Sequence, residues 1–246
     1  MNSDPAAQLR LLDLQAADTA LAQLAHRRRT LPELASITTA TVTAESLQTE
    51  VIDAQTRVDD LAGEQRKLEN EVDAVRTRAG RDEQRLLAGG LPSKELESLQ
   101  HEITSLARRQ STLEDDLLEI MEQREGVEGG LAGLIARRDE VLAERSRLEA
   151  RRDGQLAEID SQSGVRTGER GGIAAEIPAD LLALYEKVAA ANGGVGAARL
   201  HQRRCEGCHL ELAGNELTAV RNAAPETVVR CENCRRILIR TADSGL

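Results

Sequence analysis

The hydrophobic pattern of the chain is clearest between residues 96 and 159. Steps of alternately three and four residues visit nineteen positions here, and thirteen of them are apolar. The pattern keeps one phase throughout, which is typical of a helix supercoiled against a partner helix. We therefore predict a long helix that needs a second helix to cover its apolar stripe. The apolar positions are Leu96, Leu99, Ile103, Leu106, Leu113, Leu117, Ile120, Val127, Leu131, Leu134, Val141, Leu148 and Ile159.

A second helical tract, residues 5–88, supplies the partner. An apolar run with the same spacing extends from Val51 to Leu86 and has Gln65 as its polar exception. Pro32 separates this run from an earlier one. Because a proline inside a helix removes a hydrogen bond and clashes with the preceding turn, we predict a kink or short break at residues 30–32.

The segment between the two tracts predicts a tight reversal. Gly89 and Gly90 end the first helix, Pro92 cannot continue it, and Ser93 caps the next. So short a connection makes the two tracts an antiparallel hairpin whose tip lies near residues 88–93.

The hairpin also predicts which residues face one another across it. If Leu86 faces Leu96, the numbers of facing residues sum to about 182. This register brings arginines of the apolar stripe close to acidic residues of the other helix. The alternative to such ion pairs is that these arginines extend outward to solvent. The ion pairs predicted by this register are Arg124 with Asp59 or Asp60, and Arg138 with Glu45.

Four leucines near the N-terminus need a surface other than the hairpin. Residues 173–188 supply one, as a short helix with Pro178 in its first turn and an apolar face. We predict a loop over residues 161–172 between the hairpin and this helix. The four leucines are Leu9, Leu11, Leu12 and Leu14.

Two Cys-x-x-Cys pairs predict a metal site near the C-terminus. Cys205 and Cys208 form the first pair and Cys231 and Cys234 the second, with 22 residues between the pairs. Two such turns can place four thiolates around one Zn²⁺ in a closed site, which is structural and not catalytic. Two disulfides, or a thiol redox protein that uses one Cys-x-x-Cys pair, are the alternatives.

The segments around the cysteines predict a small β module. Short strands are expected at residues 195–200, 228–230 and 237–241. We expect the third residue of each cysteine turn, Gly207 and Asn233, to adopt the left-handed backbone conformation. His209 adjoins the first pair but is not needed as a ligand.

The same module is rich in arginine. Residues 199–246 carry eight arginines and six acidic residues, whereas the whole chain has a net charge of −10. Phosphate contacts from such residues would give salt-dependent binding without sequence preference, although no aromatic residue is present here to stack on bases. A solvated basic face is the alternative. The candidates for polyanion binding are Arg203, Arg204, Arg221, Arg230, Arg235 and Arg236.

The composition fits long helices and a small core. The 246 residues include no Phe or Trp and one Tyr, and 30% are charged. No apolar run is long enough to span a bilayer, and the N-terminus lacks an apolar signal segment. We therefore expect a soluble, cytoplasmic protein, in which unpaired cysteines favour metal binding over disulfides.

Taken together, the chain resembles the bacterial family that joins a coiled-coil hairpin to a C4-type zinc ribbon. The resemblance lies in the tip segment 93–103, in residues 177–186, and in the two Cys-x-x-Cys pairs followed by Ile237 and Leu238. Two residues depart from the family pattern. Leu96 stands where an aromatic residue is usual, and Arg235 follows the last cysteine, where glycine is common.

The resemblance implies a mainly α protein in two parts. Residues 1–172 would form the long antiparallel coiled-coil hairpin, and residues 173–246 a short helix and a small β zinc ribbon at the end away from the tip. It further implies a non-enzymatic adaptor that presents the hairpin and the ribbon to protein partners, and nucleic acid is a further candidate partner. Some family members are implicated in flagellar regulation through an alternative sigma factor and messenger RNA, but no residue here identifies that partner. We predict one structural Zn²⁺, no catalytic residues, no small-molecule substrate and no membrane partner.

Overall fold

The computed structural model describes all 246 residues, which form two compact units. One unit consists of residues 35–149. The other combines residues 1–34 with residues 150–246. None of the helices is both long enough and apolar enough to cross a membrane.

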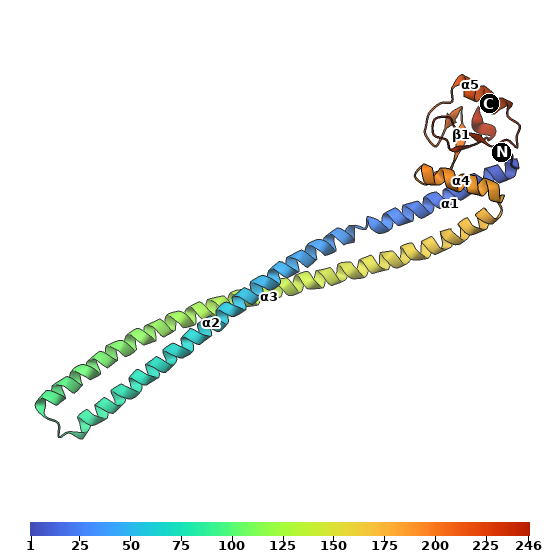
Figure 1. Cartoon of the computed structure of the whole chain (residues 1–246). Coiled ribbons are helices and arrows are strands. Elements are labelled where there is room, and N and C mark those ends of the chain that lie inside the picture. The colour runs from blue at the N-terminus through green and yellow to red at the C-terminus, as the bar shows by residue number, and fades with distance from the viewer. The chain divides into compact units, whose positions relative to one another are not determined.

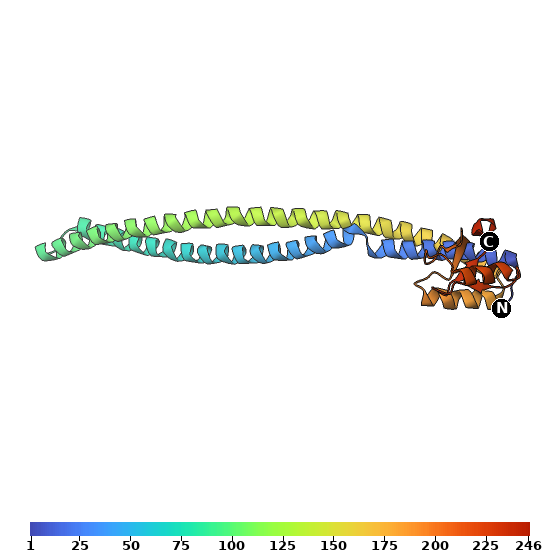
Figure 2. The same cartoon turned by 90° about the horizontal axis from the view of Figure 1, so that it is seen from above.

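Residues 35–149 form an antiparallel helical hairpin. They belong to α2 (Pro32–Ala88) and α3 (Ser93–Ala175), which lie side by side in two perpendicular views (Figures 1 and 2). Gly89 and Gly90 make the reversal with φ angles of 69° and 83°, which residues with a Cβ rarely adopt. The predicted hairpin and its tip are confirmed. Buried apolar clusters on the seam contain Val72, Val75, Leu106 and Leu113, and Val51, Val58 and Leu131.

The ion pairs predicted across the hairpin are wrong. Arg124 donates to the side-chain oxygen of Gln65 at 2.8 Å and not to Asp59 or Asp60. Arg138 donates to Gln48 at 3.0 Å and to its own neighbour Asp139 at 2.7 Å, and not to Glu45. Both arginines remain at the seam because a neutral glutamine accepts their hydrogen bond there. The placement of Leu86 opposite Leu96 stays a prediction.

The break at Pro32 is confirmed. Helix α1 (Pro5–Arg29) ends before it, and α2 begins at Pro32 itself. Between the two helices, Leu31 is buried, so the break brings an apolar side chain into the core.

The predicted loop at residues 161–172 is wrong, because α3 continues through these residues to Ala175. Helix α1 lies beside this last part of α3. The guanidinium of Arg170 donates to Asp18 of α1 at 2.7 Å, and Ile173 packs against the core between the helices. These contacts offset the low helix propensity of the glycines here, at about 1 kcal/mol each relative to alanine. Since α3 crosses residue 172, it joins the two predicted domains, and their division at 172 stays a prediction.

The C-terminal part contains α4 and a four-stranded sheet. Helix α4 spans Ala179–Ala191. The sheet has the order β2-β1-β4-β3, with β1 parallel to β4 and the other neighbours antiparallel. The three predicted strands are confirmed in location, whereas β2 and α5 were not predicted. The elements are β1 (Ala197–His201), β2 (Arg204–Cys205), α5 (Gly214–Asn222), β3 (Val229–Arg230), β4 (Ile237–Ile239) and a 3₁₀ turn (Ala242–Ser244).

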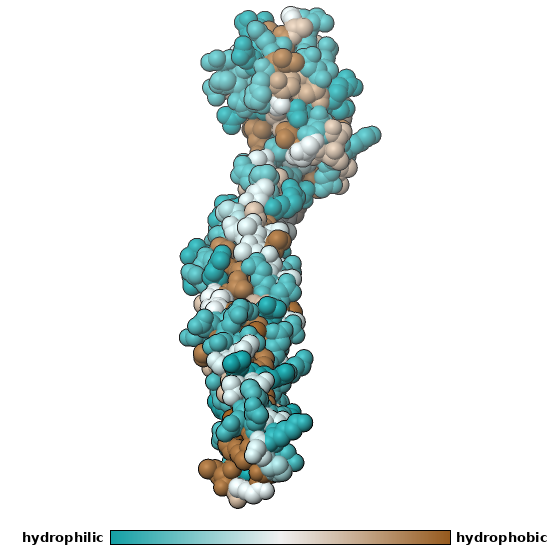
Figure 3. All heavy atoms as spheres, turned by 90° about the vertical axis from the view of Figure 1, so that its left-hand side faces the viewer, coloured by the Kyte–Doolittle hydropathy of each residue, from teal (hydrophilic) through white to brown (hydrophobic).

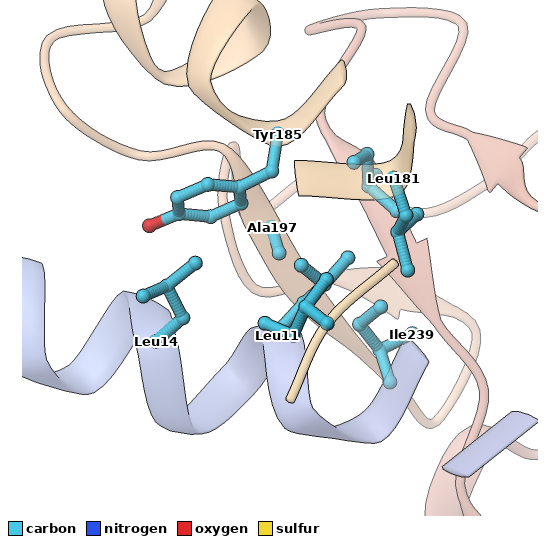
Figure 4. Packing of buried hydrophobic residues seen from close by; sticks show 8 residues of the cluster. Leu11, Leu14, Leu181, Tyr185, Ala197 and Ile239 are labelled. Atoms are coloured by element: carbon cyan, nitrogen blue, oxygen red, sulfur yellow. The ribbon is translucent and has the colours of Figure 1, made fainter. Parts of the chain in front are cut away.

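One face of the sheet packs on α1 and α4. In Figure 4, Leu11 and Leu14 of α1 face Tyr185 and Leu181 of α4, and Ala197 and Ile239 of the sheet complete the core. The predicted packing of the N-terminal leucines on residues 173–188 is therefore confirmed for Leu11, Leu12 and Leu14. Leu9 is the exception, since it is 46% exposed.

Candidate metal centre

The four cysteines meet in one cluster on the other face of the sheet. Their sulfur atoms all lie within 4.8 Å of one another. Sulfurs of different pairs approach closely, with Cys205 and Cys234 3.8 Å apart and Cys208 and Cys231 3.9 Å apart. A tetrahedron with Zn–S bonds of about 2.3 Å has S–S edges of about 3.8 Å. The donor set and its spacing therefore fit one zinc ion.

Each cysteine pair lies in a turn of the same geometry. We call residues 205–209 the first knuckle and residues 231–235 the second. The amide of His209 donates to the carbonyl of Cys205 at 2.7 Å, and the amide of Arg235 donates to that of Cys231 at 2.8 Å. His209 and Arg235 then adopt left-handed φ angles of 62° and 64°. The knuckles are thus closed by the residue that follows the second cysteine.

The expected left-handed backbone at Gly207 and Asn233 is wrong. Neither residue has a positive φ angle. Gly207 is required for space instead, because a Cβ there would lie 2.6 Å from Cδ of Arg236 and 3.0 Å from Cβ of Ala198. The glycine therefore lets the first knuckle approach the arginine that follows the second.

Burial and hydrogen bonding act in opposite directions on the thiols. Burial raises the pKa of Cys205, although the backbone amides of Cys208 and Gly207 lower it in part. Burial likewise raises the pKa of Cys231 against the amides of Cys234 and Asn233. Burial raises the pKa of Cys234 as well, but hydrogen bonds from the backbone and side chain of Arg236 and with the thiols of Cys231 and Cys208 together lower it by more. The amides of both knuckles thus favour thiolates, which are the ligands that zinc needs.

Two arginines hold the ribbon together through main-chain carbonyls. Arg236 donates to Gly207 of the first knuckle at 2.9 Å and to Val195 and Asn192 of the linker after α4 at 3.1 and 3.2 Å. Arg240 donates to five carbonyls between residues 220 and 227, at the C-terminal end of α5 and in the loop that follows. The sequence does not reveal this structural role. Arg236 and Arg240 lie near cysteines and strands, but so do the exposed arginines of the ribbon.

The six arginines predicted as polyanion-binding residues have different surroundings. Arg203, Arg204, Arg221, Arg230 and Arg235 are exposed, whereas the guanidinium of Arg236 is occupied by the three carbonyls described above. Arg221 lines a cavity with Pro5 and Leu9, and Arg230 and Arg235 line another beside α4. Polyanion binding by these residues stays a prediction.

The chain matches two family models. Residues 204–238 match a C4-type zinc ribbon domain, and residues 14–193 match the CT398-like coiled coil hairpin domain. The chain belongs to the CT398-like coiled-coil hairpin family. This confirms the predicted resemblance and fold class, and the zinc ribbon with its four clustered cysteines is consistent with the predicted single structural zinc.

Relatives and solved structures agree with this assignment. Uncharacterized proteins from two strains of Mycobacterium tuberculosis are 35% identical over 98% of both chains. A structure from Mycobacterium smegmatis has a TM-score of 0.86 at 34% identity, covering 98% of this chain and 100% of the other. CT398 from Chlamydia trachomatis has a TM-score of 0.69 at 19% identity, covering 96% and 98%, and shares the fold. The matched families are structural types and indicate no enzymatic activity.

Proposed function

We propose that this protein is a non-enzymatic adaptor that presents its helical hairpin and its zinc ribbon to protein partners. The observation that carries the proposal is a set of large apolar side chains left exposed on the hairpin. Leu118 is 57% exposed and Met121 44%, on one face of α3 because they lie three residues apart. Val42, Ile52 and Leu87 of α2 are more than half exposed as well. Exposed apolar side chains that gather on a surface are typical of protein contacts, and Figure 3 shows several such places.

The ribbon supports the same proposal. We infer that Cys205, Cys208, Cys231 and Cys234 ligate one Zn²⁺, with no position left open for water or substrate. Such an ion stabilises a small domain whose surface is then free for binding. We expect zinc analysis of the purified protein to give about one tightly held ion per chain and no reactive thiol. A zinc-free protein with a reactive Cys-x-x-Cys pair would support the redox alternative.

Capture of partners from the native host tests the adaptor role. Tagged wild-type protein should retain a protein in stoichiometric amount, also after nuclease treatment, and Leu118→Ser/Met121→Ser should lose it. Glu119→Gln/Glu122→Gln changes exposed neighbours on the same helix and serves as the matched control. If both double variants retain the same proteins as the wild type, the exposed apolar face of α3 is not the partner surface. If nuclease removes the bound material, the partner is held through nucleic acid.

A further inference from the structure

A cavity of about 380 Å³ lies between α4 and the second knuckle. Leu184, Lys187 and Val188 line it from α4, and Arg230, Cys234 and Arg235 line it from the ribbon. Both sides belong to the same compact unit. We call this hollow the basic cavity.

The charge of the basic cavity is opposite to that of the chain. Three of its lining residues, Lys187, Arg230 and Arg235, are cationic and none is acidic, although the chain carries a net charge of −10. Arg230 uses its Nε to donate to the carbonyl of Arg235 at 2.8 Å, which leaves its two terminal nitrogens as donors. All three side chains are exposed, so an anion can reach them from solvent.

The zinc centre does not account for these cations. A zinc ion with four thiolates carries a net charge of −2, and Cys234 lies in the cavity wall. The groups that hydrogen-bond with the Cys234 thiol are Arg236, Cys231 and Cys208, and none of them lines the cavity. The three cations of the cavity are therefore additional to the arginine that already stabilises this thiolate.

Most of the remaining wall is apolar. Leu184, Val188 and Ala191 supply this aliphatic surface, and Asn192 and Cys234 complete the lining, so the cavity combines cations with an aliphatic surface. A peptide with acidic and aliphatic side chains can satisfy both. A nucleic acid would use only the cations, because the single aromatic residue of the chain, Tyr185, is fully buried and cannot stack on a base. The composition of the wall thus favours a polypeptide.

We propose that the basic cavity binds an acidic, aliphatic peptide segment of a protein partner. Carboxylates of the segment pair with Lys187, Arg230 and Arg235, and an aliphatic side chain contacts Leu184 and Val188. This inference rests on the proposed adaptor function and names the chemistry of a partner for its ribbon.

Fluorescence anisotropy with the zinc-loaded, full-length protein tests the proposal. The probe is a short labelled peptide of alternating Glu and Leu, at low salt. Lys187→Glu/Arg235→Glu should weaken its binding by about tenfold or more, because charge pairs within a partly enclosed site set both affinity and specificity. Arg204→Glu/Arg221→Glu changes the net charge equally at exposed residues outside the cavity and should bind nearly as the wild type does. Zinc content and circular dichroism verify that each variant is folded.

Three outcomes would overturn the proposal. They are absence of peptide binding to the wild type, equal losses in the two double variants, and displacement of the peptide by a low concentration of oligouridylate. The last would assign the cations to nucleic acid. A matched peptide with Gln in place of Glu should bind at least tenfold more weakly, and a matched peptide with Ser in place of Leu should also lose affinity. None of these outcomes affects capture through Leu118 and Met121, so failure here is distinguishable from failure of the adaptor role.

Discussion

At the scale of single residues, each of the two knuckles places one side chain where the backbone favours glycine. His209 and Arg235 have φ angles of 62° and 64°, and each follows the second cysteine of its pair. The left-handed conformation costs a residue with a Cβ about 1–2 kcal/mol. The hydrogen bonds that close the two knuckles offset this cost.

Replacing Arg235 with glycine should therefore be tolerated. Arg235→Gly removes the strain at φ 64°, while greater freedom of the unfolded chain offsets part of the gain. We expect a net increase in the free energy of unfolding of roughly 0.5 kcal/mol, measured by thermal unfolding of the zinc-loaded protein. Arg235→Val should instead lower it by at least about 1 kcal/mol.

His209→Gly is the matched control, because His209 has nearly the same φ angle and makes the same knuckle bond. If glycine stabilises at 209 and destabilises at 235, the Arg235 side chain contributes contacts that outweigh its strain.

The sequence predicted the metal ligands but not the backbone around them. The spacing of Cys205, Cys208, Cys231 and Cys234 is enough, since two short turns bring four thiols together. The role of Gly207 could not be derived, because its need for space arises from Arg236, which is 29 residues away in the chain. The sequence shows that position 207 is a glycine, but it does not show whether the reason is backbone conformation or lack of space.

At the scale of elements, long periodic patterns predicted the paired helices well, whereas local sequence signals predicted the end of α3 poorly. The seam of α2 and α3 follows from an apolar stripe that repeats over many turns. Its polar exceptions, Gln65 and Arg124, contact each other, so matching the exceptions would have given this pairing. Residues 161–172 were predicted as a loop but belong to α3, because packing against α1 overrides the low helix propensity of their glycines.

A partly buried polar cluster joins α1, α3 and α4. The hydroxyl of Tyr185 in α4 donates to Asp18 of α1 at 2.7 Å, and Arg170 of α3 donates to the other oxygen of Asp18 at 2.7 Å. Gln15 accepts from the amide of Gly196 at 2.7 Å, just before β1. Burial raises the pKa of Tyr185, and its hydrogen bond to Asp18 raises it further.

This raised pKa predicts a loss of stability in alkali. The folded state retains the phenol proton above pH 10, near which an unfolded chain releases it. The contribution of the Tyr185 phenol to the free energy of unfolding is therefore complete below the pKa that it has in the unfolded chain. It declines as the pH rises above that pKa. Because Tyr185 is the only tyrosine and the chain has no tryptophan, absorbance at 295 nm reports its ionisation directly. We expect ionisation and loss of helical circular dichroism from this part of the chain to coincide.

Tyr185→Phe is the matched variant for this experiment. At neutral pH it should lower the free energy of unfolding by about 1–2 kcal/mol, because Asp18 loses a partly buried hydrogen bond. Between pH 9 and 11 its stability should decline less steeply than that of the wild type. Ionisation of Tyr185 well before any unfolding would contradict the prediction.

At the scale of the whole molecule, the sheet of the ribbon belongs to two cores. Ala197, Ile237 and Ile239 pack on α1 and α4, whereas Ala198, Leu200 and Leu238 pack on the side of the cysteines. The first three residues of the chain also pair with the ribbon, since the amide of Ser3 donates to the carbonyl of Glu226 at 2.8 Å. The ribbon is thus integrated with the N-terminal helix. The predicted domain division at residue 172 misses this, because it assigns α1 and the ribbon to different domains.

Removal of zinc should accordingly loosen one compact unit and spare the other. Zinc binding contributes about 10–16 kcal/mol to the folding of small zinc domains, so its loss exposes the core around Leu200 and Leu238. Through the shared sheet, the effect should extend to α4 and the first turns of α1. The clusters around Val72 and Val58 contain no residue of the ribbon and should remain protected.

Hydrogen exchange with and without a chelator measures this response segment by segment. We expect faster exchange in residues 195–241, a smaller increase in residues 5–15 and 179–191, and no change in residues 45–140. Cys205→Ser should reproduce the pattern, because three thiolates hold zinc more weakly than four, and chelator should then add little. Equal loss of protection across all segments would show that the chain unfolds as one cooperative body. In that case the separation into two compact units would describe contacts and not stability.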